Sequence, residues 1–402
     1  MMYLFVLGIR ISSFWNAKSR LWLRGRKNWY SKIQCLPAGK NSRIWFHVSS
    51  LGEFEQARTV IEKIKSDSPH TEIILTFFSP SGYELKKEYT LATTLYLPAD
   101  LPGNAKKWLQ IIKPDLAVFV KYDLWPGYIK ALSDLNIPAI LFSAHWKQQS
   151  GISSWTSPLI KNELKRFKMI FLQRPDLIDF FKKNGFENIA VAGDTRIDRA
   201  LNLAAEVKSK IPDSISEQRF DIVAGSTWPK DEDILFDVIR TQQLKAIIAP
   251  HDISPKNIDR IMEQAKGSAV KLSSLSIQLS ATQIIIVDNI GLLSVLYSLG
   301  DIAYIGGGFG KGIHNSLEAM AHKKPVIFGP HYQKFPEALD MIESGGAMTI
   351  NSKQDLYNVL NQFKKPGEAE SSGMKCYQYL QDHAGATTIV SEYILKSIPN
   401  CG

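Results

Sequence analysis

The chain has 402 residues, 45% of them hydrophobic and 22% charged, which excludes a disordered or collagen-like protein. This length predicts two or three domains, and no stretch approaches the ~20 apolar residues of a membrane-spanning helix, which excludes a polytopic membrane protein. The net charge of +9 has one source, because residues 1–52 contain nine Lys or Arg and no Asp or Glu. The other residues carry 39 basic and 39 acidic side chains, so we expect no nucleic-acid partner.

The N-terminal residues 1–42 predict a helix that lies on a membrane surface. One face of this helix would carry five apolar side chains within about 40° of one another, namely Leu4, Ile11, Trp15, Trp22 and Trp29. The opposite face would carry Arg10, Arg20, Arg24 and Lys27. Tryptophan backed by guanidinium groups is typical of a helix in the headgroup region of an anionic membrane. The alternative is a helix whose tryptophans pack on the protein body and whose charges are only solvated.

From residue 43 onward, short β-branched runs alternate with amphipathic stretches. The first set of predicted strands is 44–48, 73–78, 116–120, 139–143, 169–172 and 189–192, and the second is 222–224, 246–249, 284–287, 302–305 and 326–328. Strand–helix alternation twice over predicts an α/β protein with two Rossmann-like, doubly wound domains facing a cleft. We divide the chain into a basic segment (1–42), a first domain (43–205), a linker (206–218), a second domain (219–385) and a C-terminal helix and tail (386–402).

A candidate general base follows the first predicted strand. In Ser49-Ser50-Leu51-Gly52-Glu53, Gly52 permits a tight strand-to-helix turn that places Glu53 on the first helical turn, at the edge where ligands bind. A carboxylate there could take the proton of a bound hydroxyl. The simpler interpretation is that Glu53 only stabilises the helix N-terminus.

The run at 306–312 predicts an anion-binding loop in the second domain. Five glycines in seven residues let backbone N–H groups approach an anion, and the following helix adds partial positive charge. The spacing matches neither a Walker A loop nor a GxGxxG fingerprint. Asn315 and Glu318 fall on one helical face and could bind a sugar hydroxyl together. The alternative is a flexible glycine turn before a capped helix.

Other polar motifs also follow predicted strands. Those at 225–227, 250–252 and 288–291 would line the edge of the second domain where a nucleotide binds, although each alone is only a turn. Lys121, Asp123 and Arg196 follow strands of the first domain in the same way.

We expect no metal ion and a reducing compartment. The three cysteines, Cys35, Cys376 and Cys401, lie far apart with no CxxC motif, and the eight histidines show no ligand spacing.

Six motifs in order resemble those of the 3-deoxy-D-manno-octulosonic acid (Kdo) transferases of lipopolysaccharide synthesis. They are Ser50-Leu51-Gly52-Glu53, Leu124-Trp125-Pro126, Gly225-Ser226-Thr227, Ala249-Pro250-His251, His314-Asn315-Ser316-Leu317-Glu318 and Phe328-Gly329-Pro330-His331. The likeness covers nearly the whole chain. It implies a GT-B glycosyltransferase that moves Kdo from CMP-Kdo to lipid A precursor (lipid IVA), with inversion and without a metal or other cofactor. It also implies a place at the cytoplasmic face of the inner membrane of a Gram-negative bacterium.

The resemblance assigns roles to residues of this chain. The catalytic base of the family falls on Glu53, and a basic residue thought to stabilise the transition state falls on Arg196, where many relatives carry Lys. The contacts to CMP fall on Pro250, His251, Ile290, Gly291, Leu292, Asn315, Ser316, Leu317 and Glu318.

The chain departs from the family pattern at three positions. Lys121 stands where many relatives have an acid, His251 replaces an Arg, and Ser316 replaces a Pro. We expect Lys121 to pair with the donor's carboxylate or phosphate, or else to form a salt bridge with Asp123. Two other functions stay open, namely a GT-B transferase or epimerase that uses a UDP-sugar, and a membrane-bound nucleotide-sugar-binding protein without turnover.

Overall fold

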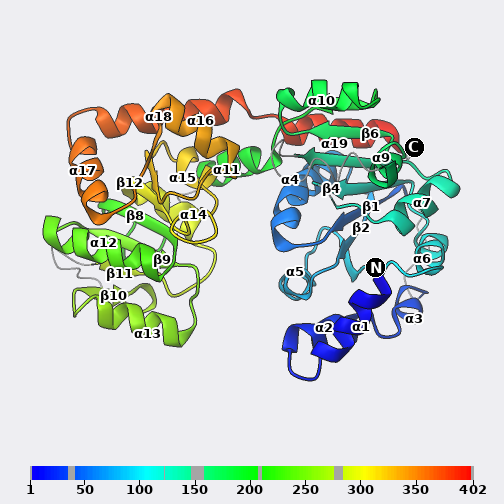
Figure 1. The fold of residues 1–402 in the computed structure, drawn as a ribbon, viewed down its shortest axis with the longest axis horizontal. Coiled ribbons are helices and arrows are strands. Elements are labelled where there is room, and N and C mark those ends of the chain that lie inside the picture. Colours follow the sequence, from blue (N-terminus) through cyan, green and yellow to red (C-terminus); the bar gives the residue numbers. More distant parts are fainter. Residues whose placement is uncertain are drawn as a thin grey trace. The chain divides into compact units, whose positions relative to one another are not determined.

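The computed structural model describes residues 2–34, 41–121, 123–145, 158–206, 211–275 and 284–399. The chain forms two compact units. Unit 1 comprises Met1–Asp198 with Ala384–Gly402, and unit 2 comprises Arg199–His383. Each unit holds a seven-stranded parallel sheet with helices on both faces (Figure 1), which confirms the two predicted Rossmann-like domains. The cleft predicted between the domains stays a prediction.

The sheet of unit 1 has the strand order β3-β2-β1-β4-β5-β6-β7. Its strands are β1 (Arg43–Val48), β2 (Glu72–Phe77), β3 (Thr93–Tyr96), β4 (Leu116–Val120), β5 (Ala139–Ala144), β6 (Met169–Leu172) and β7 (Ile189–Val191). The chain order reverses between β1 and β4, so the topological switch point, where ligands bind in such sheets, lies between their carboxyl ends. Alternate residues of β1 enter different cores, with Trp45 on one face and Ile44 and Phe46 on the other.

Helices cover both faces of this sheet. They are α4 (Leu51–Asp67), α5 (Pro80–Lys86), α6 (Asn104–Ile112), α7 (Pro126–Asp134), α9 (Pro158–Leu164), η1 (Pro175–Leu177), α10 (Ile178–Lys183) and, after α11 (Thr195–Ala205) has run from unit 1 into unit 2, α19 (Ala386–Ser397). The last of these, α19, returns from the far end of the chain to pack on α4, with Val390 and Ile394 in the core of unit 1. The Asp198 carboxylate accepts hydrogen bonds from Gly385 N and Thr387 N, each at 2.6 Å, and so holds the start of α19.

The N-terminal segment forms three short helices, α1 (Met2–Ser12), α2 (Ala17–Arg26) and α3 (Trp29–Gln34). The predicted single helix with one tryptophan stripe is therefore wrong. Asn16 caps the start of α2, and the left-handed conformation of Asn28 (φ +55°) interrupts the helical course between α2 and α3. As a result, Trp22 is only 5% exposed while Trp15 is 71% exposed. Within the described ranges, no helix has the length and apolar character needed to cross a bilayer.

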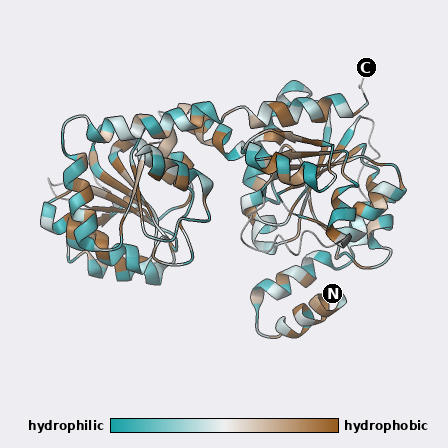
Figure 2. Cartoon of the chain, turned by 45° about the horizontal axis from the view of Figure 1, so that its top comes forward, coloured by the Kyte–Doolittle hydropathy of each residue, from teal (hydrophilic) through white to brown (hydrophobic). Residues whose placement is uncertain are grey.

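The sheet of unit 2 has the order β10-β11-β9-β8-β12-β13-β14, with its switch point between β8 and β12. Its strands are β8 (Phe220–Thr227), β9 (Ala246–Pro250), β10 (Ala269–Lys271), β11 (Ile284–Ile286), β12 (Gly300–Ile305), β13 (Val326–Phe328) and β14 (Ala347–Thr349). Figure 2 shows these strands as hydrophobic ribbons flanked by helices of mixed hydropathy.

The helices of unit 2 alternate with these strands. They are α12 (Pro229–Gln242), α13 (Pro255–Gln264), η3 (Leu272–Ser274), α14 (Leu293–Leu296), η4 (Tyr297–Leu299), α15 (Leu317–Ala321), α16 (Pro336–Ser344), α17 (Lys353–Phe363) and α18 (Glu368–Asp382). The sequence missed β3, β10 and β14, which are short strands at or near sheet edges and lack the continuous apolar run of a central strand.

Candidate active site

Glu53 lies in the first turn of α4, directly after β1 and beside the switch point of unit 1. Its Oε2 accepts hydrogen bonds from Ser49 N (2.6 Å) and Ser50 N (3.0 Å), while Ser50 Oγ accepts one from Glu53 N (3.4 Å). This is a capping box, so Glu53 does stabilise the helix N-terminus. The box uses only one carboxylate oxygen, and no hydrogen-bond partner for Oε1 is found among the described residues. The second oxygen is therefore available to a substrate hydroxyl.

The surroundings of Glu53 suit a proton acceptor. Burial raises the pKa of the Glu53 carboxyl, and the nearby Asp123 carboxylate raises it further. The Ser49 N–H, His47 and Lys121 act in the opposite direction. A carboxylate with a raised pKa at a sheet's ligand-binding edge is typical of a general base.

Asp123 organises a polar network behind Glu53. Its carboxylate accepts Ser49 Oγ–H at 2.7 and 2.8 Å and the indole Nε1–H of Trp125 at 2.9 Å. His47 is fully buried, and its Nε2 lies 3.2 Å from Asp123 Oδ2. The other ring nitrogen, His47 Nδ1, lies 2.8 Å from Thr76 Oγ1. These contacts hold the loop before α4, which contains Ser49, against the segment that follows β4, which contains Asp123.

His47 and Thr76 are functional candidates that the sequence analysis missed. Each is a buried polar residue in a strand that is apolar apart from its charged first residue. That interruption of the apolar run was the available signal.

Lys121 and Arg196 lie at the same edge of unit 1. Lys121 directly follows β4 in a left-handed conformation (φ +62°), which is uncommon outside glycine. Burial acts to raise the pKa of Asp194, but the Arg196 guanidinium, with a further contribution from Lys121, holds it below its usual value. Arg196 Nη2 is 2.5 Å from Asp194 Oδ2, so this guanidinium already has a carboxylate partner. The structure thus brings the charges of Glu53, Lys121 and the Asp194–Arg196 pair together.

The glycine loop of unit 2 is held by hydrogen bonds. Asp231 Oδ2 accepts from Gly307 N at 2.9 Å, and its Oδ1 accepts from Tyr304 Oη–H at 2.8 Å. A Cβ on Gly306 would lie 2.3 Å from Ser226 O, and one on Gly308 would lie 2.6 Å from Gly329 N. Close backbone packing therefore requires these two glycines, independently of any anion.

Three aromatic rings stack beside this loop. The rings of His251 and His314 have centroids 4.5 Å apart, and those of Trp228 and His251 are 4.8 Å apart. Burial, followed by the charge of a protonated His251, lowers the pKa of His314 to about 4. His314 is thus neutral near pH 7, and His251, which follows β9, faces it across the stack.

The remaining candidate nucleotide contacts lie on the same edge of unit 2. Asn315 Nδ2 donates to Glu318 Oε1 at 3.2 Å, which shows that these side chains do meet. Ser316 is buried, and its hydroxyl has no hydrogen-bond partner among the described residues. Leu317 is part of the core, so it can offer a ligand only its backbone. Pro250 is the last residue of β9 and is buried as well.

The 290–292 turn precedes α14. Ile290 is 82% exposed, and Gly291 has φ +101°. His322, which directly follows α15, donates through Nε2 to Ser294 O at 2.7 Å and so ties α14 to α15. The turn and the Asn315–Glu318 segment therefore belong to one edge.

No group of three or more His, Cys, Asp or Glu side chains in the described part of the chain is placed to hold a metal ion. Cys376 is buried, and burial raises the pKa of its thiol to about 12. Cys35 and Cys401 lie outside the described residues.

The chain is similar to known proteins over most of its length. The family model of the 3-deoxy-D-manno-octulosonic-acid transferases (kdotransferases) matches residues 23–199. The 3-deoxy-D-manno-octulosonic acid transferase of Haemophilus influenzae is 28% identical over 387 residues, covering 90% of this chain and 88% of that protein.

Two solved structures show the fold alone. The UDP-GlcNAc 2-epimerase of Neisseria meningitidis has a TM-score of 0.60 at 14% identity and covers 88% of this chain and 99% of its own. The MurG protein of Acinetobacter baumannii has a TM-score of 0.56 at 12% identity and covers 89% of this chain and 99% of its own. These likenesses confirm the predicted GT-B fold.

Proposed function

We propose that this chain, which belongs to the Kdo transferase family and is a glycosyltransferase, moves Kdo from CMP-Kdo to a hydroxyl group of lipid A precursor (lipid IVA). The observation that carries the proposal is Glu53, a carboxylate with one uncommitted oxygen and a raised pKa at the switch point of unit 1. The similarity to Kdo transferases supports Kdo as the transferred sugar. CMP-Kdo as the donor and lipid IVA as the acceptor are part of the proposal.

In the proposed reaction, Glu53 Oε1 takes the proton of the acceptor hydroxyl as its oxygen attacks the anomeric carbon of Kdo. The bond between that carbon and the phosphate oxygen of CMP breaks, and CMP leaves with the electron pair. Attack opposite the leaving group inverts the anomeric configuration. Asp123 and Ser49 act as positioning residues, because they hold the loop on which Glu53 is placed.

Unit 2 would hold the nucleotide through the segments at its sheet edge. The exposed 290–292 turn, His251 and the Asn315–Glu318 segment offer backbone and side-chain donors to CMP. We propose that Lys121 and Arg196 pair with the anionic groups of the donor. Arg196 would have to share its guanidinium with Asp194 or exchange that partner for the ligand.

We further propose that the reaction needs no metal ion. The charge that develops on the departing phosphate can be stabilised by fixed backbone N–H dipoles and by cationic side chains. We place the enzyme at the cytoplasmic face of the inner membrane, bound peripherally through its N-terminal helices, because its acceptor is a lipid. The acid-free residues 1–52 support an anionic surface as partner.

The test is transfer by the purified full-length chain from CMP-Kdo to lipid IVA in detergent micelles, followed by mass spectrometry. We expect products that are heavier by whole Kdo residues. Transfer only from UDP-sugars, or tight binding of CMP-Kdo with no product, would overturn the proposal in favour of another GT-B enzyme or of a binding protein without turnover.

A further inference from the structure

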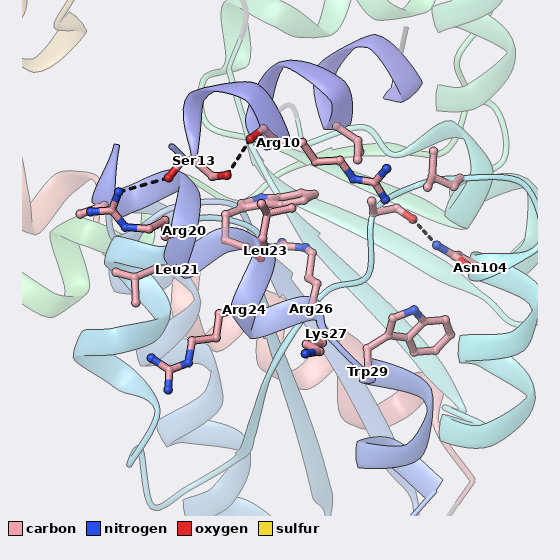
Figure 3. A pocket seen from close by; sticks show the side chains of 15 residues that line it. Arg10, Ser13, Arg20, Leu21, Leu23, Arg24, Arg26, Lys27, Trp29 and Asn104 are labelled. Carbon is pink, nitrogen blue, oxygen red and sulfur yellow. Dashed lines mark hydrogen bonds between the residues drawn. The ribbon is translucent and has the colours of Figure 1, made fainter. Parts of the chain in front are cut away.

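A hollow of about 930 Å³ opens in unit 1 among the N-terminal helices and the segment before α6. Figure 3 shows the residues that line it, which come from α1, α2, the start of α3 and the segment that leads into α6. Five of the lining residues are cationic, namely Arg10, Arg20, Arg24, Arg26 and Lys27, and none is acidic. Apolar side chains such as Leu21, Leu23 and Trp29 lie between them.

One of the five cations has a structural role. Arg26 is buried, donates to Leu97 O and Phe78 O, each at 2.8 Å, and lies 4.0 Å from the centre of the Trp22 ring. Burial lowers the pKa of its guanidinium to about 9. Arg26 fixes α2 to the body of unit 1 and is not needed for a ligand.

The other four cations are exposed and line the hollow, and the Arg20 guanidinium also donates hydrogen bonds to Ser13 O (3.1 Å) and Phe14 O (3.4 Å). Arg10, Arg20, Arg24 and Lys27 form no ion pair with a carboxylate within the described ranges. Figure 3 shows the guanidinium groups of Arg20 and Arg24 spread around the hollow rather than converging on one point. A single small anion would leave most of them unpaired, so the arrangement suits a larger headgroup with more than one anionic or polar group. Ligand sites for molecules of such size measure about 300–1,000 Å³.

An exposed apolar surface adjoins the hollow. It consists of Leu4, Leu7, Ile11, Phe14 and Trp15, each more than half exposed. Large apolar side chains gathered in this way mark a binding surface for a partner or a lipid. A cationic hollow beside an apolar helix complements a molecule that carries both phosphate and acyl chains.

The hollow is linked by direct contacts to the candidate active site. The Arg26 guanidinium lies 4.8 Å from the centre of the Phe78 ring, and the rings of Phe78 and Trp125 are 4.6 Å apart. Trp125 donates in turn to Asp123, which holds the loop of Glu53. The hollow and the general base thus lie at the same side of unit 1.

We propose that this hollow binds the phosphorylated sugar headgroup of the acylated acceptor, with Arg10, Arg20, Arg24 and Lys27 pairing with its phosphates and the apolar face of α1 lying along its acyl chains. This inference rests on the proposed function, since it names where that function's lipid substrate is held. It makes these cations specificity-determining residues for the acceptor and not only a source of attraction to membranes.

The test compares two double variants of the full chain, R10Q/R24Q and K18Q/K32Q. Both remove two positive charges from exposed positions of the N-terminal helices, but Lys18 and Lys32 do not line the hollow. Binding is measured by co-flotation with phosphatidylcholine vesicles that contain lipid IVA, enzymatically dephosphorylated lipid IVA, or phosphatidylglycerol at equal charge. We expect R10Q/R24Q to lose roughly ten- to a hundredfold in affinity for lipid IVA vesicles, because charge-assisted hydrogen bonds are lost. K18Q/K32Q should lose far less affinity for these vesicles. Removing the phosphates of lipid IVA should weaken binding of the wild-type chain about as much as the R10Q/R24Q substitutions do.

Two outcomes would overturn the inference. Equal losses for the two variants would show only general attraction by charge, and equal effects on lipid IVA and phosphatidylglycerol vesicles would make the hollow a site for bilayer phospholipid. Transfer assays separate this inference from the proposed function. If the wild-type chain transfers Kdo and R10Q/R24Q keeps the wild-type KM for lipid IVA, the hollow is not the acceptor site. If R10Q/R24Q selectively loses lipid IVA binding while the wild-type chain transfers nothing, the proposed function alone fails.

Discussion

The indole Nε1–H of Trp228 donates a hydrogen bond of 2.9 Å to Nε2 of His314, a residue 86 positions away in the chain. This bond requires an unprotonated Nε2, so it selects the neutral His314 tautomer that carries its proton on Nδ1. His314 directly precedes the Asn315–Glu318 segment. Because Trp228 occupies Nε2, the protonated Nδ1 is the ring nitrogen that His314 can offer to a bound nucleotide.

Replacing Trp228 with Phe should raise the pKa of His314 from about 4 toward its ordinary value of 6.5. The substitution keeps an aromatic ring but removes the N–H group that opposes protonation of Nε2. The pKa is measured by following the His314 ring protons in an NMR titration, with His251→Gln as a second variant that removes the neighbouring imidazole. An unchanged titration in Trp228→Phe would show that the hydrogen bond does not hold the tautomer.

The same shift predicts a pH dependence of stability. A histidine whose pKa is lowered in the folded state binds its proton more readily when unfolded, so stability falls as the pH drops from about 6.5 toward 4. Urea unfolding across this window should show a shallower loss for Trp228→Phe than for wild type. If the free energy of unfolding falls with pH equally in the two proteins, the lowered pKa of His314 is not the cause of this pH dependence.

Glu53→Gln should reduce the transfer rate by roughly 10²–10⁴-fold, because the amide cannot accept a proton. Binding of CMP-Kdo should be retained. The Gln side-chain oxygen can still accept the Ser49 and Ser50 N–H groups. Burial raises the pKa of Glu53, so ionising this carboxyl costs more free energy in the folded protein than in the unfolded chain. We therefore expect the variant to melt no lower than wild type. Residual turnover above about a tenth of wild type, measured by single-turnover assays, would mean that Glu53 is not the base.

Asp123→Asn should move the acidic limb of the pH profile, where kcat/KM for transfer falls as the pH is lowered, to lower pH. Burial and then the Asp123 charge raise the pKa of Glu53, and the substitution removes the second cause. The rate requires deprotonated Glu53, so the pH at which half the activity is lost should fall. This is read from kcat/KM profiles, in which Ser49→Ala serves as a control that loses a hydrogen bond to Asp123 but keeps its charge. If both variants shift the limb alike, loop position and not charge determines it.

Lys121→Ala should weaken CMP-Kdo binding by about ten- to a hundredfold and CMP binding much less, if its ammonium pairs with the carboxylate of the donor. CMP lacks that carboxylate, so calorimetry with the two ligands isolates the contact. The variant is first shown to be folded by circular dichroism. Small and equal losses for both ligands would leave Lys121 with a structural role only.

Chelation by EDTA should leave the transfer rate unchanged. The proposed stabilisation of the leaving phosphate uses N–H dipoles and side-chain cations rather than a metal ion. A rate that collapses in EDTA and returns with Mg²⁺ or Mn²⁺ would refute metal independence.

The two α/β units and most central strands, such as β1, β4 and β12, could be predicted from the amino-acid sequence. Strands buried on both faces of a parallel sheet are short, continuous apolar runs, and such a run is readable locally. The sequence also placed Glu53 on the first turn of a helix, because Ser50 and Gly52 precede it in a recognisable capping pattern. The family likeness came from the same local motifs.

The contacts between residues that are distant in the chain could not be predicted from local sequence patterns. The network of Asp123, Ser49 and His47, the Trp228–His314 bond and the return of α19 to unit 1 all depend on contacts across 70 or more positions. The N-terminal segment shows the same limit. The prediction that this segment is helical was correct, but the helix is divided at Asn16 and Asn28. The resulting change of direction places Trp22 beneath the Arg26 guanidinium and leaves Trp15 exposed. Periodicity describes one helix, whereas the burial of a side chain depends on which surface the fold brings against it.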